Sequence, residues 1–476
     1  MTTADARPMR PFSRQLPSLV WGLGVLLACL IPTDAAIADA VVLGQRAIED
    51  DQRRSVMLVV QNGGTSRVDW DTIRLGGKEI GEALRIDNHR RLGSPVDWVD
   101  LRGGSVEAGE AATLILGYAE KSWLDQRPTL ELIDDRSGRA HALKIEPTPD
   151  TRVQIASAGF DDDLDRLTLL VTNTAPRAAK VDAVLFNGRV ANAAPSAASI
   201  PPGGVVELVV PLTRVDRGQD CNVVVRTGEG DAVAWLRALP AESLTYLFYS
   251  RWCDPRDLAE KGIDVGSDYF EANAEFARLL DGNGGQWPEG AKQELARRVT
   301  GFLEKPNAWG WYVQDDAGWG NPSPRALIAV RDFIREQGSH HPQIVCNPAD
   351  NVRYAWTGDL IMNYSYHVTH QTPDPTRFTG GRSLDLVRQL NAPLPIVYLV
   401  DTVGQGVRWI TSAEQELASY SMIGRGAQYP GWFLGPSMWE QGEGRGGATD
   451  PFDDQPWRYQ EGLTANTETG HAVRAI

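Results

Sequence analysis

Acidic side chains end two apolar, strand-like runs that lie far apart in the sequence. The run WGWYVQDDA, which begins at Trp309, contains the adjacent residues Asp315 and Asp316, and the run PIVYLVD ends at Asp401. Two carboxyl groups flanking a glycosidic bond can hydrolyse it, because one protonates the leaving oxygen while the other attacks the anomeric carbon. Apolar surroundings of Trp and Tyr would keep the first carboxyl neutral. Asp401 is predicted to be the nucleophile of such a pair.

The alternation of side chains along a strand distinguishes the two adjacent aspartates. Trp309, Trp311 and Val313 form an apolar set that suits packing under helices. The other set is Gly310, Tyr312, Gln314 and Asp316. Asp316 is therefore predicted to face a ligand cleft as the general acid and base. In the alternative interpretation, both aspartates are solvated residues at the start of a turn.

Polar residues also follow the other predicted strands. In a barrel of alternating strands and helices, functional groups project from the carboxyl ends of the strands. Exposed aromatic rings, such as those of Trp319 and Trp439 among polar residues, can stack on the apolar face of a sugar. Glu440 is the substitute carboxylate if the strand count is off by one. The predicted substrate-binding residues are Arg251, Asp268, Trp319, Asn347, Asn363, Tyr366, His367 and Trp439.

Residues 241–476 are predicted to form the domain that positions these groups. An order of apolar strand, polar turn and helix recurs there, which is typical of parallel α/β architecture. The predicted strands are 244–250, 262–266, 309–316, 343–347, 359–364, 395–401 and 428–434. Helix starts are expected at Ser323-Pro324 and Thr411-Ser412. The pattern predicts a (β/α)8 TIM-like barrel, incomplete if its third strand is reduced to the Gly-rich stretch 281–287.

The amino-terminal half has a different pattern and an internal repeat. Short alternating apolar runs, broken by Gly, Pro, Asn and Asp, indicate all-β sandwich structure. The run VMLVVQNGGTSRVDWDTIRLGGK is echoed by LTLLVTNTAPRAAKVDAVLFNGR, and in each copy a strand reaches an asparagine, Asn62 or Asn173, before the chain turns back. We predict two immunoglobulin-like β-sandwiches, 41–150 and 151–240.

The segment WGWYVQDDA resembles the G-W-Y-x-x-D-E-P segment that ends the fourth strand of many TIM-barrel glycoside hydrolases. The stretch LASYSMIGRGAQYPGWFLGPSMWE resembles the helix, turn and aromatic eighth strand of such barrels. The resemblance covers residues 242–476 and implies hydrolysis of glycosidic bonds, with no cofactor expected. Asp316 stands where the family has Glu, and Ala317 where it has Pro. Because Asp is one methylene shorter, a non-catalytic carbohydrate-binding or cell-envelope protein is the alternative function.

Residues 1–40 have the pattern of a secretory signal peptide. Three arginines precede an apolar run from Leu19 to Ile31, and small residues follow in an A-x-A arrangement. This run is too short to span ~30 Å of hydrocarbon comfortably, so no membrane span is expected in the mature chain. The protein is predicted to be exported, to the periplasm or the extracellular space, with lipid anchoring through Cys29 as the alternative.

Charge and the remaining motifs narrow the range of partners. The net charge of -15 argues against nucleic acid or an anionic membrane, since both attract basic patches, and an oligo- or polysaccharide is the expected partner. His367 and His370 have an H-x-x-H spacing without a third ligand, so no metal is predicted and a metal-assisted hydrolase is a distant alternative. Asp161, Asp163 and Asp165 indicate a β-turn, because the Gly and Glu of a calcium loop are absent.

Overall fold

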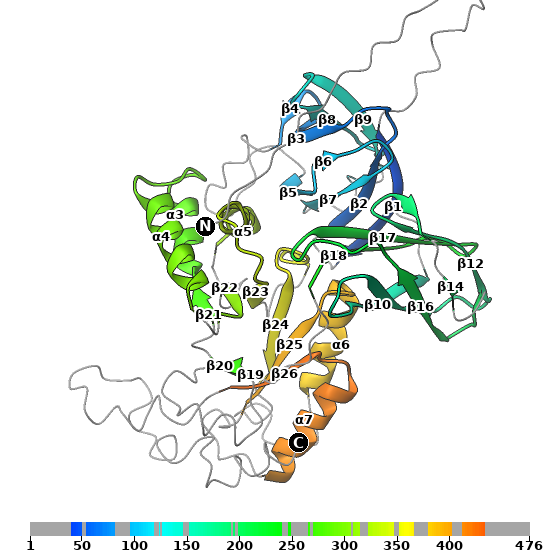
Figure 1. Cartoon of the computed structure of the whole chain (residues 1–476). Helices are drawn as coiled ribbons and strands as arrows, with labels where there is room; N and C mark the ends of the chain where they lie inside the picture. The colour runs from blue at the N-terminus through cyan, green and yellow to red at the C-terminus, as the bar shows by residue number, and fades with distance from the viewer. Residues whose placement is uncertain are drawn as a thin grey trace, which may run out of the picture. The chain divides into compact units, whose positions relative to one another are not determined.

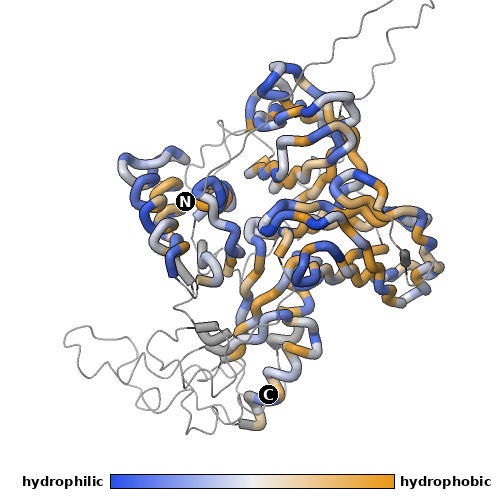
Figure 2. The backbone as a smooth tube through the Cα atoms, in the orientation of Figure 1, coloured by the Kyte–Doolittle hydropathy of each residue, from blue (hydrophilic) through white to orange (hydrophobic). Residues whose placement is uncertain are grey.

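The computed structural model describes residues 40–49, 54–80, 96–118, 123, 126–145, 152–191, 194–195, 199–239, 246–248, 265–266, 270–305, 308–314, 322–346, 352–365, 379–401 and 412–433. The predicted signal peptide lies outside these residues, apart from Ala40. Strands predominate in the described part, and hydrophobic residues run along the strands of the sheets (Figure 2). None of the described helices has the length and apolar character needed to cross a membrane.

The first β-sandwich comprises strands β1 to β9. They are β1 (Ala40–Glu49), β2 (Arg54–Asn62), β3 (Val68–Leu75), β4 (Lys78–Glu79), β5 (Val96–Arg102), β6 (Ser105–Val106), β7 (Ala111–Tyr118), β8 (Thr129–Asp134) and β9 (Arg139–Lys144). One sheet has the order β1-β2-β7-β5, and the other has β4-β3-β8-β9 with β6 paired to β3. Inward side chains of the two sheets, including Val56, Leu58 and Trp70, form one buried core.

The second β-sandwich comprises strands β10 to β18. They are β10 (Val153–Phe160), β11 (Arg166–Asn173), β12 (Ala179–Phe186), β13 (Arg189–Val190), β14 (Ala194–Pro195), β15 (Ser199–Ile200), β16 (Val205–Pro211), β17 (Asp220–Thr227) and β18 (Ala232–Arg237). Its sheets have the orders β10-β11-β16-β14 and β13-β12-β17-β18, with β15 paired to β12. Each strand thus has a counterpart at the same place in the first sandwich, so the repeat seen in the sequence is a repeat of topology.

The paired asparagines hold the same turn in both sandwiches. Asn62 Nδ2 donates to the carbonyl oxygens of Ser66 at 2.8 Å and of Val106 at 3.0 Å. Asn173 Nδ2 donates in the same way to the residue four positions on, at 2.7 Å, and to Ile200 O at 3.0 Å. Each side-chain oxygen also accepts from the backbone N–H two residues later. Asn62 and Asn173 are buried, and so are their bonds to Val106 O and Ile200 O, so each amide satisfies a backbone carbonyl that is shielded from water.

The carboxyl-terminal part forms a curled sheet of parallel strands (Figure 1). The strands are β19 (Tyr246–Phe248), β20 (Val265–Gly266), β21 (Phe270–Ala272), β22 (Gly310–Gln314), β23 (Gln343–Cys346), β24 (Leu360–Ser365), β25 (Ile396–Asp401) and β26 (Tyr429–Phe433). Their order is β20-β19-β26-β25-β24-β23-β22-β21. The helices of this part are α3 (Ala274–Gly282), α4 (Ala291–Leu303), α5 (Pro324–Glu336), α6 (Thr379–Asn391) and α7 (Ser412–Gly424). The predicted starts of α5 and α7 are confirmed.

The sheet is an incomplete barrel, and the assignment to the TIM-barrel glycoside hydrolases is wrong. β20 and β21 stand at opposite ends of the strand order, and no pairing joins them among the described residues. β20 has 2 residues and β21 has 3, so neither presents the row of backbone groups that a closing ladder requires. The coarser prediction, of β-sandwiches followed by a parallel sheet with helices, is confirmed, whereas the predicted (β/α)8 barrel is present only as a curled, incomplete sheet in the described residues.

The third strand was predicted in the wrong place. Residues 281–287 end α3 and form a turn, in which Gly284 and Gly285 have φ of 66° and 84°. Side chains other than hydrogen disfavour such values, which is why glycines occupy this turn. The strand that precedes β22 is instead β21, Phe270–Ala272. Three residues are too few to show a detectable alternation.

A buried ion cluster joins the first sandwich to α5. The carboxylate of Asp100 on β5 accepts hydrogen bonds from Arg331 Nη1 and Nη2, at 2.8 and 2.7 Å, and from Arg102 Nε at 2.7 Å. Burial raises the pKa of Asp100, but the charges of Arg102 and Arg331 outweigh it and hold that pKa well below its usual range. The Arg102 guanidinium also stacks on Trp235 of β18, with its Cζ 3.6 Å from the ring centroid. All three parts of the chain therefore meet at this cluster.

A second ion cluster joins the second sandwich to the start of β24. Asp359 accepts hydrogen bonds from Arg237 Nη1 at 3.0 Å and from Arg335 Nη2 at 2.6 Å. Arg335 Nη1 also donates to Asp220 of β17 at 3.3 Å. Burial raises the pKa of Asp359, and the guanidinium groups of Arg237 and Arg335 more than offset this, so the pKa is lowered. Since Asp359 precedes its strand, this contact is made at the amino edge of the sheet.

Residues 352–358 insert between these clusters. Trp356 is fully buried, and its carbonyl oxygen accepts a hydrogen bond from Arg102 Nη2. The Arg46 guanidinium lies 5.5 Å from the centre of the Trp356 ring. Ser55 Oγ of β2 donates to Val352 O at 2.8 Å. The first sandwich therefore makes hydrogen bonds to the loop that leads into β24, again at the amino edge of the sheet.

Candidate functional site

The carboxyl ends of the parallel strands define the candidate site. β22, β23, β24 and β25 are consecutive neighbours, and they end at Gln314, Cys346, Ser365 and Asp401. Every pair among them is parallel, so these ends share one edge of the sheet. Parallel α/β sheets bind ligands at this edge. The structure therefore brings the end of the WGWYVQ run and Asp401 to the edge opposite the one that the sandwiches hold.

The sheet has one face toward the helices and an opposite face, called here the inner face. The buried inner cluster comprises Tyr312, Ile344, Cys346, Leu360, Met362, Val397, Leu399 and Tyr429. Trp311 packs instead with residues of α3, α4 and α5, such as Phe302 and Leu327. The predicted alternation is thus confirmed for Trp311 and Tyr312. It is wrong for Trp309, which precedes the strand and contacts Tyr429 on the inner side, with 5.5 Å between ring centroids.

A β-bulge interrupts this alternation near the end of β22. Tyr312 stands level with Ile344, but Gln314 stands level with Val345, so Val313 is an extra residue. Ile344 belongs to the inner cluster, whereas Val345 packs with the helices. The alternation that links Tyr312 to Asp316 in the sequence therefore cannot be carried past Val313. Asp315 and Asp316 themselves lie outside the described residues.

Asp401 occupies the last position of β25. Its backbone is level with Phe433 of β26, and the pairing with that strand is regular from Val397 onward. Leu399 packs in the inner cluster, and Val400 packs on the helix side. Asp401 is thus two positions beyond an inner residue in an unbroken strand. Its side chain is outside the described part of the chain.

Asn363 is fully buried in the middle of β24. It stands level with Tyr398 of β25, and its neighbour two positions earlier, Ile361, packs on the helix side. The regular pairing of these strands gives Asn363 the register of the helix-facing residues. The structure therefore locates this predicted substrate-binding residue within the sheet, short of its carboxyl edge at Ser365.

The other predicted site residues lie outside the described residues. They are Asp316, Glu440, Arg251, Asp268, Trp319, Asn347, Tyr366, His367 and Trp439. His370 also lies outside, and within the described residues no three metal-ligating side chains come together. The predicted turn at Asp161 is present, since its Oδ1 accepts from the backbone N–H groups of Asp165 and Arg166.

Asn273 is a residue at the candidate edge that the sequence analysis missed. It follows β21 directly, and its backbone N–H donates to Tyr312 O of β22 at 3.1 Å. The side chain is fully buried, yet neither Nδ2 nor Oδ1 has a hydrogen-bond partner in the described part of the chain. Asn273 occupies the N-cap position of α3 without capping it, whereas Ser323 Oγ accepts from Ala326 N at 3.2 Å on α5. Buried amides are normally hydrogen-bonded, so substitution of Asn273 tests whether its side chain contributes to stability.

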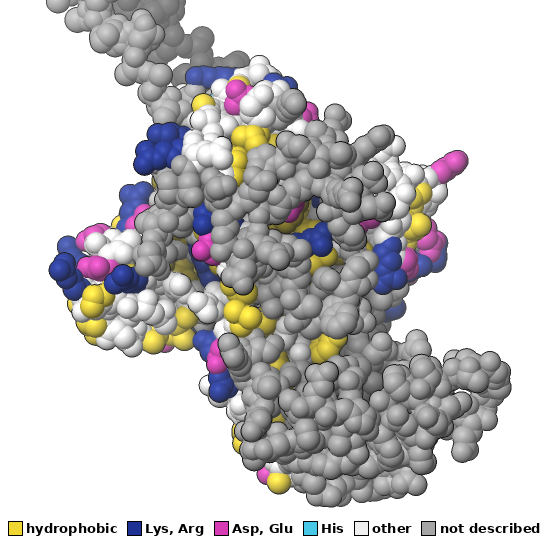
Figure 3. Space-filling model, turned by 180° about the vertical axis from the view of Figure 1, so that it is seen from behind, with side chains coloured by type: hydrophobic (Ala, Val, Ile, Leu, Met, Phe, Trp, Pro, Cys, Tyr) yellow, Lys and Arg dark blue, Asp and Glu magenta, His cyan; other side chains and the backbone are white. Residues whose placement is uncertain are grey.

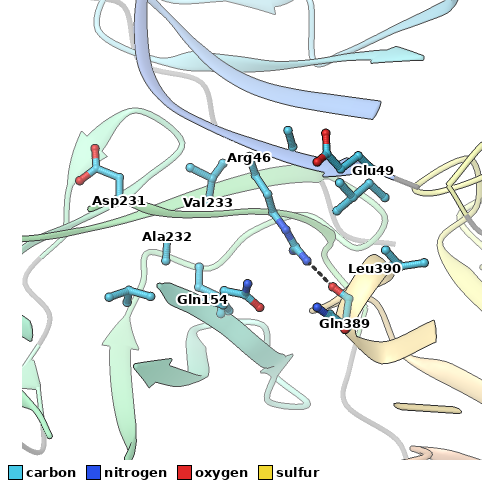
Figure 4. Close-up of a pocket in the computed structure, with 12 residues that line it drawn as sticks. Arg46, Glu49, Gln154, Asp231, Ala232, Val233, Gln389 and Leu390 are labelled. Carbon is cyan, nitrogen blue, oxygen red and sulfur yellow. Dashed lines mark hydrogen bonds between the residues drawn. The ribbon is translucent and has the colours of Figure 1, made fainter. Parts of the chain in front are cut away.

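Two cavities open at the amino edge, on the side of the sandwiches. A cavity of about 600 Å³ lies between Phe160 and Leu170 of the second sandwich and the strand starts at Leu360 and Tyr429. The other, of about 210 Å³, is lined by β1, β10, β18 and α6. In Figure 4, Arg46 reaches across it toward α6, where Nη2 donates to Gln389 O at 2.9 Å.

The buried Arg46 side chain in this cavity is held by hydrogen bonds to the end of α6. It also donates to Ala392 O, so one guanidinium satisfies two carbonyl oxygens at the end of α6. A cation there interacts favourably with the helix dipole. Burial lowers the pKa of Arg46 to about 10, and the group remains charged at neutral pH. The smaller cavity is therefore part of the junction between the sandwiches and the sheet.

Charges of both signs are mixed on the described surface. On the face shown in Figure 3, Lys and Arg side chains alternate with Asp and Glu side chains. Surface pairs such as Arg189 with Glu110, at 3.2 Å, and Lys180 with Asp182, at 3.3 Å, fit this mixture. The described part of this face therefore carries charges of both signs.

No protein-family model and no curated protein sequence matches this chain. Similar solved structures include a protein of unknown function from Porphyromonas gingivalis W83, at 12% identity over 42% of this chain and 99% of that one, with a TM-score of 0.15. A titin fragment matches at 11% identity over 42% of this chain and 96% of its own length, with a TM-score of 0.13. Scores this low support no conclusion about fold or function.

Proposed function

We propose that the protein hydrolyses glycosidic bonds at the carboxyl edge of its parallel sheet, with Asp401 in a carboxylate pair. The observation that carries this proposal is that β22 and β25 end at the same edge of one parallel sheet. Asp401 follows two positions after Leu399 of the inner cluster, so alternation favours an inward carboxylate. The chain beyond Gln314 supplies the candidate partners, Asp315 and Asp316.

Curvature of the sheet is needed for such a pair to meet. β23 and β24 stand between β22 and β25. Neighbouring strands lie ~4.8 Å apart, so a flat sheet would separate β22 from β25 by ~14 Å. Retaining hydrolysis needs ~5 Å between the carboxyl groups and inverting hydrolysis ~6.5–9.5 Å. The curl of the sheet (Figure 1) supports the proposal, since inward side chains of a curled sheet converge.

The β-bulge at Val313 affects which of the two aspartates after β22, Asp315 or Asp316, is favoured as the general acid. Gln314 is level with Val345, which packs on the helix side, and the next residue of β23, Cys346, belongs to the inner cluster. Alternation resumed after the bulge favours Asp315, whereas the uninterrupted pattern favours Asp316. Both carboxylates are therefore candidates for the general acid, and the experiment must separate them.

We further propose an oligo- or polysaccharide as the substrate and an exported protein as its setting. The signal-peptide pattern of residues 1–40 supports export, and the acidic composition supports an uncharged or basic partner over nucleic acid. The sandwiches are proposed to be immunoglobulin-like, which is compatible with their two antiparallel sheets.

The test is release of reducing ends from a panel of polysaccharides. Wild type is compared with Asp315→Asn, Asp316→Asn and Asp401→Asn, and with Asp182→Asn as a control on an exposed strand position of the second sandwich. Loss of an acid–base group lowers the rate by about 10² to 10⁴. We expect this loss for one of the two adjacent aspartates and a loss at least as large for Asp401→Asn, which removes the proposed nucleophile, while the control keeps wild-type activity.

Two outcomes would contradict the proposal. No release by wild type from any polysaccharide, with glycan binding retained, would favour a carbohydrate-binding protein instead. Release that is unchanged in Asp401→Asn would remove this residue from the mechanism. Circular dichroism of each variant ensures that a lost rate is not a lost fold.

A further inference from the structure

Helix α7 carries large apolar side chains on the side that faces away from the sheet. Leu417 and Tyr420 are each 54% exposed, and Ile423 is 41% exposed. The opposite side of the helix packs on β25 and β26 through buried residues that include Ala418 and Met422. Two sides of α7 are thus apolar, and the described structure buries one of them.

Helices that are apolar on every side are normally buried on every side. Helix α5, on another part of the sheet, follows the usual pattern, with Leu327 and Ile334 buried and charged residues such as Glu336 exposed. Single exposed apolar residues, such as Leu279 on α3, are ordinary. Exposed apolar residues at positions i, i+3 and i+6 of one helix instead form a continuous stripe. Such a stripe indicates a surface that another chain segment covers.

We propose that residues 434–476 of this chain cover the exposed face of α7. The chain leaves β26 at Phe433, and α7 packs on that strand. α6 packs on β24, which precedes it, and α7 packs on β25, which precedes it, so successive segments lie side by side across the sheet. Continued by one step, this order places the segment that follows β26 beside α7.

The length and composition of this segment fit the stripe. α7 has 13 residues, so a helix of about 13 residues would run along its whole ~20 Å length. Residues 434–476 exceed this length and end in LTANTETGHAVRAI, where Ala472, Val473 and Ile476 have the spacing of one helical face. A second copy of the protein and an unrelated partner are the other occupants that the experiment must distinguish.

The experiment compares the full chain with Leu417→Asp and with Leu279→Asp as a matched control. Leu279 is 46% exposed on α3 and lies outside the stripe. Hydrogen exchange of peptides from residues 434–476 is measured, together with the molar mass by light scattering. We expect exchange in that segment to quicken by about tenfold or more in Leu417→Asp, because an aspartate beneath the covering segment would remove the apolar contact that Leu417 makes with it. The control should leave exchange and mass unchanged.

Three results would overturn the proposal. A wild-type dimer that Leu417→Asp converts to a monomer, with unchanged exchange in residues 434–476, would assign the stripe to a second copy. Unchanged exchange and unchanged mass would mean that the stripe faces water. Equal effects of Leu279→Asp and Leu417→Asp would show a general response to added charge. None of these readouts depends on glycan hydrolysis.

Discussion

Replacing Asp100 with asparagine tests whether the sandwiches and the parallel sheet unfold as one unit. The Asp100 side chain is 1% exposed and accepts three hydrogen bonds from Arg102 and Arg331. Asparagine preserves the shape but removes the charge, so two guanidinium groups lose their shared carboxylate. Removing one partner of a buried ion pair costs about 3–5 kcal/mol. Because Arg331 keeps a contact with Asp332 at 2.8 Å, we expect a loss near 3 kcal/mol.

The assay is urea unfolding followed by tryptophan fluorescence and by far-UV circular dichroism. Fluorescence comes from all fifteen tryptophans, among them Trp235 and Trp356 at the junction, and so reports on side-chain packing, whereas dichroism reports on the sheets. We expect coincident transitions in wild type and a lower free energy of unfolding in Asp100→Asn. The control is Asp182→Asn, which breaks an exposed pair with Lys180 and should cost at most ~1 kcal/mol.

Acid provides a second readout of the same group. The pKa of Asp100 is lowered in the folded protein, so its contribution is fully present above the unfolded value of ~3.9 and is lost as the pH falls toward the folded value. Wild type should therefore lose stability progressively below about pH 5, and Asp100→Asn should lose less over the same range. A cost below ~1 kcal/mol in Asp100→Asn, or separate transitions for the two probes in wild type, would refute the junction described here.

Four further substitutions test the described structure by chemical unfolding. Trp356→Ala should cost about 3–5 kcal/mol, because a fully buried ring is removed from the junction, and a smaller cost would mean that the loop repacks. Asn62→Ala and Asn173→Ala should each cost about 1–3 kcal/mol, since each leaves one buried carbonyl oxygen, of Val106 or Ile200, without its donor and removes two further hydrogen bonds, and clearly unequal costs would argue against equivalent turns. Asn273→Leu should leave the free energy of unfolding unchanged or raise it by up to ~1 kcal/mol, because it removes buried polar atoms without partners, whereas a large loss would reveal a partner.

Local patterns predicted local structure well. Ser323-Pro324 predicted the start of α5 because a serine oxygen and a proline each suit a helix start by themselves, whatever surrounds them. The repeated runs ending in Asn62 and Asn173 predicted two sandwiches of equal topology, since each turn is satisfied within its own module. Alternation within one strand correctly predicted that Trp311 packs against the helices and that Tyr312 lies on the inner face.

Features that depend on distant residues could not be predicted in this way. The bulge at Val313 exists only in the pairing of β22 with β23, so alternation along one strand gave no sign of it. β21 is too short for any periodicity, and its role comes from pairing with β22. Whether the sheet closes also depends on the pairing of β20 with β21, which no local pattern encodes.

The sequence alone predicted the longer strands, the starts of α5 and α7 and the acid that ends β25, because side-chain period and capping act over a few residues. Tertiary structure decided that Asp100 neutralises Arg331, 231 positions away, and that the sandwiches hold the amino edge of the sheet. A buried charge is stable only beside its counter-charge. Which counter-charge lies beside Asp100 depends on how the sheets and helices pack, and that packing depends on residues throughout the chain.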